Sequence, residues 1–177
     1  MAELTSEQGY EATKIADIVR RAGVARKTLY DNFDGKEEVF LAAFDSAVTE
    51  ASERIAAACA ETEDDWERRI EAGLRALLAY IAENPATARL CLIEAYSATP
   101  AASRRYDEML GRCVELLREN GPSAYDRPET TEETIAGGVA WILNQKIRRG
   151  ETEQVPELLP ELLDFVLSPY HGVADRS

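Results

Sequence analysis

Five side chains that suit DNA recognition lie within a span of seven residues near the start of the chain. They are Arg26, Lys27, Thr28, Tyr30 and Asn32. Arginine and lysine can pair with guanine, asparagine with adenine, and threonine or tyrosine hydroxyls can bond phosphate oxygens. Leu29 and Phe33 are an apolar pair four residues apart, which predicts a helix whose inner face they form. The five polar side chains then point elsewhere, as a DNA-reading helix requires.

The residues before and after this helix predict a helix-turn-helix. An apolar stripe at helical spacing runs through Ile15, Ile18, Val19 and Ala22. Thr13 is placed to cap that helix at its N-terminus, and Gly23 to end it where a positive φ is usual. Downstream, Asp34 is a candidate cap for the next helix, and Lys36 falls in its first turn, where backbone N–H groups also favour a phosphate.

The charge distribution separates this segment from the rest of the chain. The net charge is -13 over 177 residues, which would ordinarily argue against a nucleic-acid partner. Residues 13–36, however, hold six basic against three acidic side chains, or +3. Affinity for phosphates follows the local electrostatic field and not the total charge. An acidic protein can therefore still bind DNA through the basic segment 13–36.

The segment GYEATKIADIVRRAGVARKTLYDNFDGKEEVFLAAF resembles the DNA-binding domain of TetR-family transcriptional regulators. The matching residues are Gly9, Tyr10, Thr13, Ile15, Ile18, Ala22, Gly23, Val24, Thr28, Leu29, Tyr30, Phe33, Lys36, Glu37 and Val39. The resemblance implies a homodimer on double-stranded DNA with a two-fold operator. It also implies a C-terminal domain that often binds a small-molecule effector, and repression that such a ligand releases.

Carried over by position, the resemblance assigns the DNA contacts. They are Thr13, Lys14, Arg26, Lys27, Thr28, Tyr30, Asn32 and Lys36. Tyr30 and Lys36 correspond to phosphate contacts, and Arg26, Lys27 and Thr28 to base readers. Two departures weaken the match: Ala25 stands where a capping serine is frequent, and only eight residues precede Gly9. The first helix is therefore expected to be short, with Leu4 as its one large apolar residue, and Met1 need not be the natural start.

The remaining sequence predicts an all-α fold of about nine helices, with no strand pattern. Residues 1–45 are expected to form the helix-turn-helix domain, here called the reader. Residues 46–177 are expected to form a helical-bundle domain for ligand binding and dimerisation, here called the body. The expected spans are 2–8, 14–21, 25–31, 36–60, 64–83, 86–97, 101–119, 130–149 and 156–167. The fourth helix crosses the boundary, so the two parts would share it.

A ligand cavity in the body has six candidate lining residues. They are Trp66, Tyr80, Cys91, Glu94, Tyr96 and Met109. The competing interpretation is ordinary core packing, with Glu94 at an edge or paired with an arginine. For the dimer interface the last two helices offer wide apolar faces, and the adjacent Gly137 and Gly138 cost helix stability that a close backbone approach would explain. The predicted interface residues are Ile135, Gly138, Val139, Ile142, Leu158, Leu162 and Phe165.

Other function classes have little support. No phosphate loop, nucleophile motif or metal-ligand spacing occurs, so an enzyme, a cofactor and a metal are not expected. The three cysteines, Cys59, Cys91 and Cys113, are predicted to be small buried apolar residues. No membrane span is expected, and the protein should be cytoplasmic. The remaining alternative is a ligand- or protein-binding helical module that does not bind DNA because its first helix is incomplete.

Overall fold

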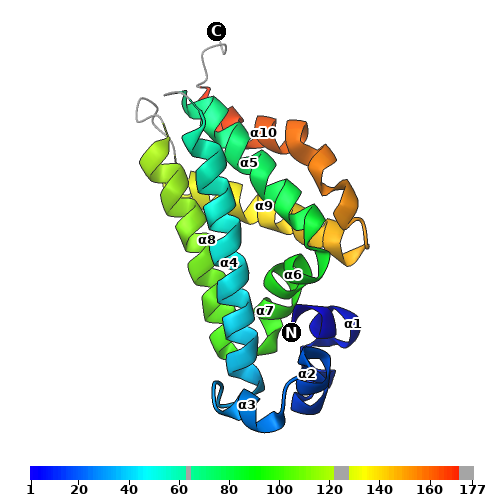
Figure 1. Cartoon of the computed structure of the whole chain (residues 1–177). Helices are drawn as coiled ribbons and strands as arrows, with labels where there is room; N and C mark the ends of the chain where they lie inside the picture. The colour runs from blue at the N-terminus through cyan, green and yellow to red at the C-terminus, as the bar shows by residue number, and fades with distance from the viewer. Residues whose placement is uncertain (63–64, 122–127, 172–177) are drawn as a thin grey trace.

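A computed structural model describes residues 1–62, 65–121 and 128–171 of the chain, and these residues form helices with no strand among them. Figure 1 shows a small group of helices at the N-terminal end and a longer bundle above it, joined by one long helix. None of the described helices is long and apolar enough to cross a bilayer.

The reader domain begins with α1 (Ala2–Ala12), α2 (Ile15–Ala22) and α3 (Arg26–Tyr30). Their shared core consists of Leu4, Ile18 and Leu29, all buried, with Phe33 and Val39 packed against them. Leu4, with Met1 packed beside it, therefore joins α1 to α2 and α3.

Two local details of the reader differ from the sequence-based expectation. α1 runs past residue 8 to Ala12, although Gly9 adopts a non-helical conformation (φ 80°, ψ 162°) and kinks it. Lys14, and not Thr13, occupies the N-cap position of α2, and its backbone N–H donates to Asp17 Oδ2 at 3.2 Å. The Thr13 hydroxyl is turned inward and donates to the Gly9 carbonyl at 2.8 Å. Gly23 does end α2 in the left-handed region, with φ 67°.

The long helix α4 (Lys36–Ala60) leaves the reader and runs the length of the body, where α5 (Trp66–Glu83) packs along it (Figure 1). Gly35, not Asp34, occupies the N-cap position of α4. Asp65 caps α5 by accepting from the backbone N–H groups of Glu67 and Arg68.

The expected single helix 86–97 is divided into three parts. α6 (Pro85–Arg89) continues into a π-helical turn, η1 (Leu90–Glu94), and then into α7 (Ala95–Ala98). The Ala95 N–H donates to the Leu90 carbonyl, a five-residue spacing that widens the turn. Such single π turns recur at functional sites.

The rest of the body consists of α8 (Pro100–Asn120), α9 (Thr131–Arg148), η2 (Thr152–Leu158), α10 (Leu159–Leu167) and η3 (Ser168–Tyr170). The segment 152–158 is a 3₁₀ turn that precedes α10, so the expected helix 156–167 starts three residues later as an α-helix. Pro156 contributes here because it lacks the N–H that an α-helical interior needs.

The main core lies between α5, α9 and α10, around Leu78, Leu143 and Leu162. A second core joins the two parts of the molecule, since Tyr10 and Phe40 pack with Leu90 and Ala95. The reader therefore contacts the π-turn region of the body directly, besides being connected to it through α4.

Candidate DNA-binding surface and ligand groove

The recognition helix α3 presents its polar side chains to solvent. Arg26, Lys27 and Thr28 are exposed, and Tyr30 is 45% exposed although it is aromatic. The Arg26 guanidinium lies 5.6 Å from the Tyr30 ring centroid, and its Nη2 is 3.4 Å from the Tyr30 hydroxyl. α3 thus offers cationic and hydroxyl groups on one side while Leu29 anchors the other.

The remaining predicted DNA contacts divide into three situations. Lys14 is exposed at the N-terminus of α2, and the Asn32 side-chain amide donates to the Thr28 carbonyl at 2.8 Å. Lys36 is half-buried, and its Nζ donates to the Tyr10 carbonyl at 2.9 Å. Thr13 is only 1% exposed, so its side chain cannot reach DNA in this conformation, which corrects its assignment as a contact.

Ion pairs within the reader determine which of its basic side chains remain available for DNA phosphates. Arg20 pairs with Asp17 at 2.7 Å, and Arg21 with both Glu3 and Glu7 on α1. These carboxylates hold the pKa of Arg21 above its usual value. In the described parts of the chain no acidic side chain pairs with Lys14, Arg26 or Lys27. The local positive field therefore centres on α3 and not on α2.

The six residues predicted to line one cavity are dispersed. Trp66 packs on Tyr170, with ring centroids 4.6 Å apart and planes tilted by 58°, whereas Tyr96 packs on Tyr106. The Tyr80 hydroxyl lies 3.4 Å from Glu50 in the α4–α5 interface, and burial with that carboxylate raises the pKa of Tyr80 to about 12. Met109 packs against the core that joins reader and body.

Glu94 and Cys91 follow the packing interpretation. Glu94 accepts the Tyr10 N–H at 3.0 Å and lies 3.6 Å from Arg89 Nε. Cys91 is buried, and the apolar surroundings raise the pKa of its thiol to about 12. Among the residues that the structure describes, no group of histidine, cysteine, aspartate and glutamate side chains could hold a metal ion.

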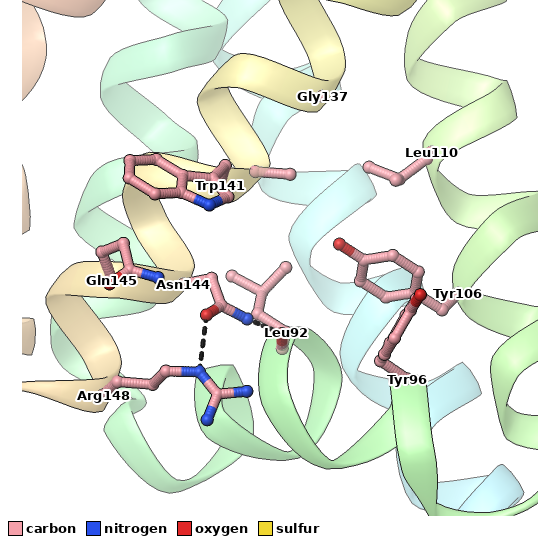
Figure 2. A pocket seen from close by; sticks show the side chains of 10 residues that line it. Leu92, Tyr96, Tyr106, Leu110, Gly137, Trp141, Asn144, Gln145 and Arg148 are labelled. Atoms are coloured by element: carbon pink, nitrogen blue, oxygen red, sulfur yellow. Dashed lines mark hydrogen bonds between the residues drawn. The ribbon is translucent and has the colours of Figure 1, made fainter.

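A groove of about 480 Å³ opens between α8, α9 and the π turn. Of the six candidates it includes only Tyr96, and its lining is Leu92, Tyr96, Tyr106, Leu110, Gly137, Ala140, Trp141, Asn144, Gln145 and Arg148. Figure 2 shows Trp141 on one side, Tyr106 and Leu110 on the other, and Arg148 at the lower edge. The walls are largely apolar, and the polar groups gather at one end.

Hydrogen bonds organise the polar end. The Asn144 amide donates to the Leu92 carbonyl at 2.7 Å, and Arg148 Nε donates to Asn144 Oδ1 at 2.8 Å (Figure 2). Sequence reasoning missed Asn144 and Arg148, which lie three and seven residues after Trp141 on a helix whose opposite face is core. The available signal was the alignment of these three residues on one face.

Comparison with known proteins shows which proteins this chain resembles. The model of the bacterial regulatory proteins of the tetR family matches residues 2–43. The N-terminal part of the chain therefore matches the DNA-binding domain of the tetR family. A curated relative, the uncharacterised HTH-type transcriptional regulator YezE of Bacillus subtilis, is 41% identical over 44 residues. That match covers 25% of this chain and 23% of the relative.

Solved structures of bacterial regulators extend the likeness to residues beyond the N-terminal domain. The fatty acid degradation regulator FadR of Bacillus halodurans superposes with a TM-score of 0.81 over 94% of this chain and 93% of its own, at 19% identity. FadR of Bacillus subtilis in complex with stearoyl-CoA gives 0.79 over 95% and 94%, at 17% identity. At such identities the likeness establishes the fold. The family and these neighbours are transcriptional regulators and not enzymes.

The surface expected to pair two copies of the chain is narrower than the sequence suggested. Ile135 and Leu162 are buried inside the protomer's own cores and cannot also meet a partner without unpacking them. Val139, Ile142 and Leu158 are partly covered by the same cores. Trp141 and Phe165 remain exposed, at 65% and 39%. The outer face of α9 and α10 therefore centres on these two aromatic rings.

Proposed function

We propose that this chain is a homodimeric transcriptional repressor of the TetR family that binds a two-fold operator and is released by a small-molecule ligand. The observation that carries the proposal is the exposed α3, with Arg26, Lys27 and Tyr30 presented outward on the family's N-terminal domain. A helix of this kind enters the major groove, and two copies spaced about one helical turn apart, roughly 34 Å, read the two half-sites.

Dimerisation supports DNA binding for an electrostatic reason. Four cations of the reader have no acidic partner among the described residues: Lys14, Arg26, Lys27 and Lys36. Four cations in front of a strongly acidic body give a small number of phosphate contacts. Salt dependence and affinity both grow with the number of phosphates neutralised, so two linked readers bind far better than one. We place the dimer contact on the outer face of α9 and α10, at Trp141 and Phe165.

The groove is the proposed effector site, and its chemistry favours an amphipathic organic anion. Leu92, Tyr106 and Leu110 would contact an apolar chain, while Arg148 and Asn144 would hold a carboxylate, phosphate or thioester oxygen at the polar end. A partner protomer packed on α9 would close the open side of the groove. Since one structural neighbour was solved with stearoyl-CoA, a long-chain acyl-CoA is the first ligand to test.

The decisive experiment is a selection of bound duplexes from a random DNA library with the full chain. We expect enrichment of an inverted repeat whose half-sites lie about one helical turn apart. A parallel selection with an Arg26→Ala, Lys27→Ala variant serves as the matched control. If both proteins enrich the same sequences, or neither enriches any, the chain does not read DNA through α3, and the helical-module alternative gains support.

The oligomeric state needs an independent measurement. Light scattering at micromolar concentration should give twice the mass of one chain. A monomer at that concentration would contradict the proposed mechanism, because the two-fold operator requires two readers in fixed relation.

A further inference from the structure

The contact between reader and body converges on the backbone of Tyr10. The kink at Gly9 interrupts α1, and a helix that restarts leaves its first N–H groups without helical partners. The Tyr10 N–H is such a group, and Glu94 Oε2 accepts it at 3.0 Å from a position 84 residues further along the chain. Glu94 therefore caps the last turn of α1 from outside the reader.

Glu94 is held in place by a second partner. Its side chain is 13% exposed, and its Oε1 lies 3.6 Å from Arg89 Nε, a buried nitrogen with no hydrogen-bond partner in the described structure. The Glu94 carboxylate thus balances the positive charge of Arg89 and at the same time accepts the hydrogen bond from the Tyr10 N–H. Because both partners depend on its position, a small displacement of Glu94 is costly at two places.

Tyr10 passes this contact on to the start of α4. Its carbonyl accepts from Lys36 Nζ at 2.9 Å, and the same ammonium lies 4.0 Å from the Tyr10 ring centroid. The ring also packs edge-on against Phe40, with centroids 5.1 Å apart. Movement of Tyr10 consequently changes how Lys36 and the first turn of α4 are held, directly after the recognition helix.

The other end of the π turn lies in the groove. Leu92, two residues before Glu94, lines the groove and receives the Asn144 amide on its carbonyl. Asn144 is in turn fixed by Arg148 (Figure 2). One five-residue π turn therefore contacts the groove through Leu92 and the reader through Glu94, with a single residue between them.

We propose that the turn Leu90–Glu94 is the coupling element between groove and reader, acting through Glu94 as a positioning residue for Tyr10 and Lys36. The inference rests on the proposed function for its biological meaning. An occupant that engages Asn144 or Arg148 displaces Leu92, and the turn carries this displacement to Glu94. The reader then loses its external cap, and Lys36 is rearranged where a DNA phosphate would lie.

Amide hydrogen exchange of the full chain, without DNA or ligand, tests the coupling. Glu94→Ala should speed exchange of the Tyr10 amide by about tenfold or more, the amount expected when a hydrogen bond to a charged group is lost. Asn144→Ala, on the far side of the turn, should speed the same amide several-fold. Gln145→Ala is the matched control, since Gln145 lines the groove and has no hydrogen bond to the turn in the described structure.

Core amides of α5 serve as the reference in each variant, so that global destabilisation is recognised. If Glu94→Ala does not fold, Glu94→Gln retains an acceptor for Tyr10 but removes the charge opposite Arg89, and should give a smaller acceleration. Unchanged Tyr10 exchange in Asn144→Ala, with faster exchange confined to the turn, would overturn the coupling. This readout requires neither operator nor effector, so it is independent of the DNA selection.

Discussion

The Phe165 ring of α10 lies directly over Gly138 of α9. A Cβ at Gly138 would stand 3.0 Å from Phe165 Cζ, whereas one at the neighbouring Gly137 would meet nothing within 4 Å. The sequence suggested that a second backbone approaches this glycine pair. The structure shows instead that Gly138 accommodates a ring of the same chain, and only Gly137 faces open space.

This difference makes the two glycines a matched pair for thermal unfolding. Gly137→Ala should stabilise α9 by about 1 kcal/mol because alanine favours a helix and has room here. Gly138→Ala gains the same propensity but must displace Phe165, so it should be less stable than Gly137→Ala. Equal melting temperatures for the two variants would contradict the packing of Phe165 on Gly138.

The roles on α3 can be separated by binding to the selected operator and to random DNA. Tyr30→Ala should weaken both, as expected for a phosphate contact, while Lys27→Ala should relax discrimination at one or two base pairs by about 1–3 kcal/mol. Arg104→Ala, which removes the same charge from an exposed position on α8, is the control for net charge. The reverse pattern would exchange the two assigned roles.

The polar end of the groove predicts charge-selective ligand binding. Arg148→Gln should weaken stearoyl-CoA binding by about tenfold, because a charged hydrogen bond is lost, and should leave binding of an uncharged amphiphile nearly unchanged. Arg149→Gln, at the residue that directly follows α9 and lies outside the groove lining, is the comparison. Calorimetry that finds both variants equally affected would argue against a specific role for Arg148.

The buried thiol of Cys91 should be inert in the native protein. Because burial raises its pKa to about 12, only about one thiol in ten thousand is ionised at pH 8, and the thiolate is the reactive form. Mass-spectrometric mapping after alkylation at pH 8 should find Cys91 unmodified until denaturant is added. Labelling of native Cys91 at the rate of a free thiol would show that this part of the core opens readily.

The pKa shift of Cys91 also predicts a dependence of stability on pH. The thiol ionises near 9 when unfolded and near 12 when folded, so its contribution is complete below pH 9 and is lost between pH 9 and 12. The pKa of Tyr80 is also raised to about 12, so the contribution of Tyr80 to the free energy of unfolding is lost toward the upper end of that range. Cys91→Ala should therefore show a weaker decline in urea midpoint over this interval than the unmodified chain. An identical decline would assign the effect to the other groups.

Local sequence determined most of the reader and the helix inventory. The stripe through Ile15, Ile18 and Val19, the positive φ at Gly23 and the Leu29–Phe33 pair depend on neighbours within one or two turns, so their signals are present in the sequence itself. The Asp65 cap and the long helix 36–60 were predictable for the same reason.

Tertiary structure decided which of the side chains are available. The sequence shows that Thr13, Ile135 and Leu162 are suitable for contact, but their burial depends on segments far away in the chain. Trp66 and Tyr96 appear equally suited to a cavity, yet only Tyr96 lies at the groove. Glu94 illustrates the limit best: its partner Tyr10 lies 84 residues earlier, and a hydrogen bond across that separation exists only because the kink at Gly9 and the π turn bring the two together.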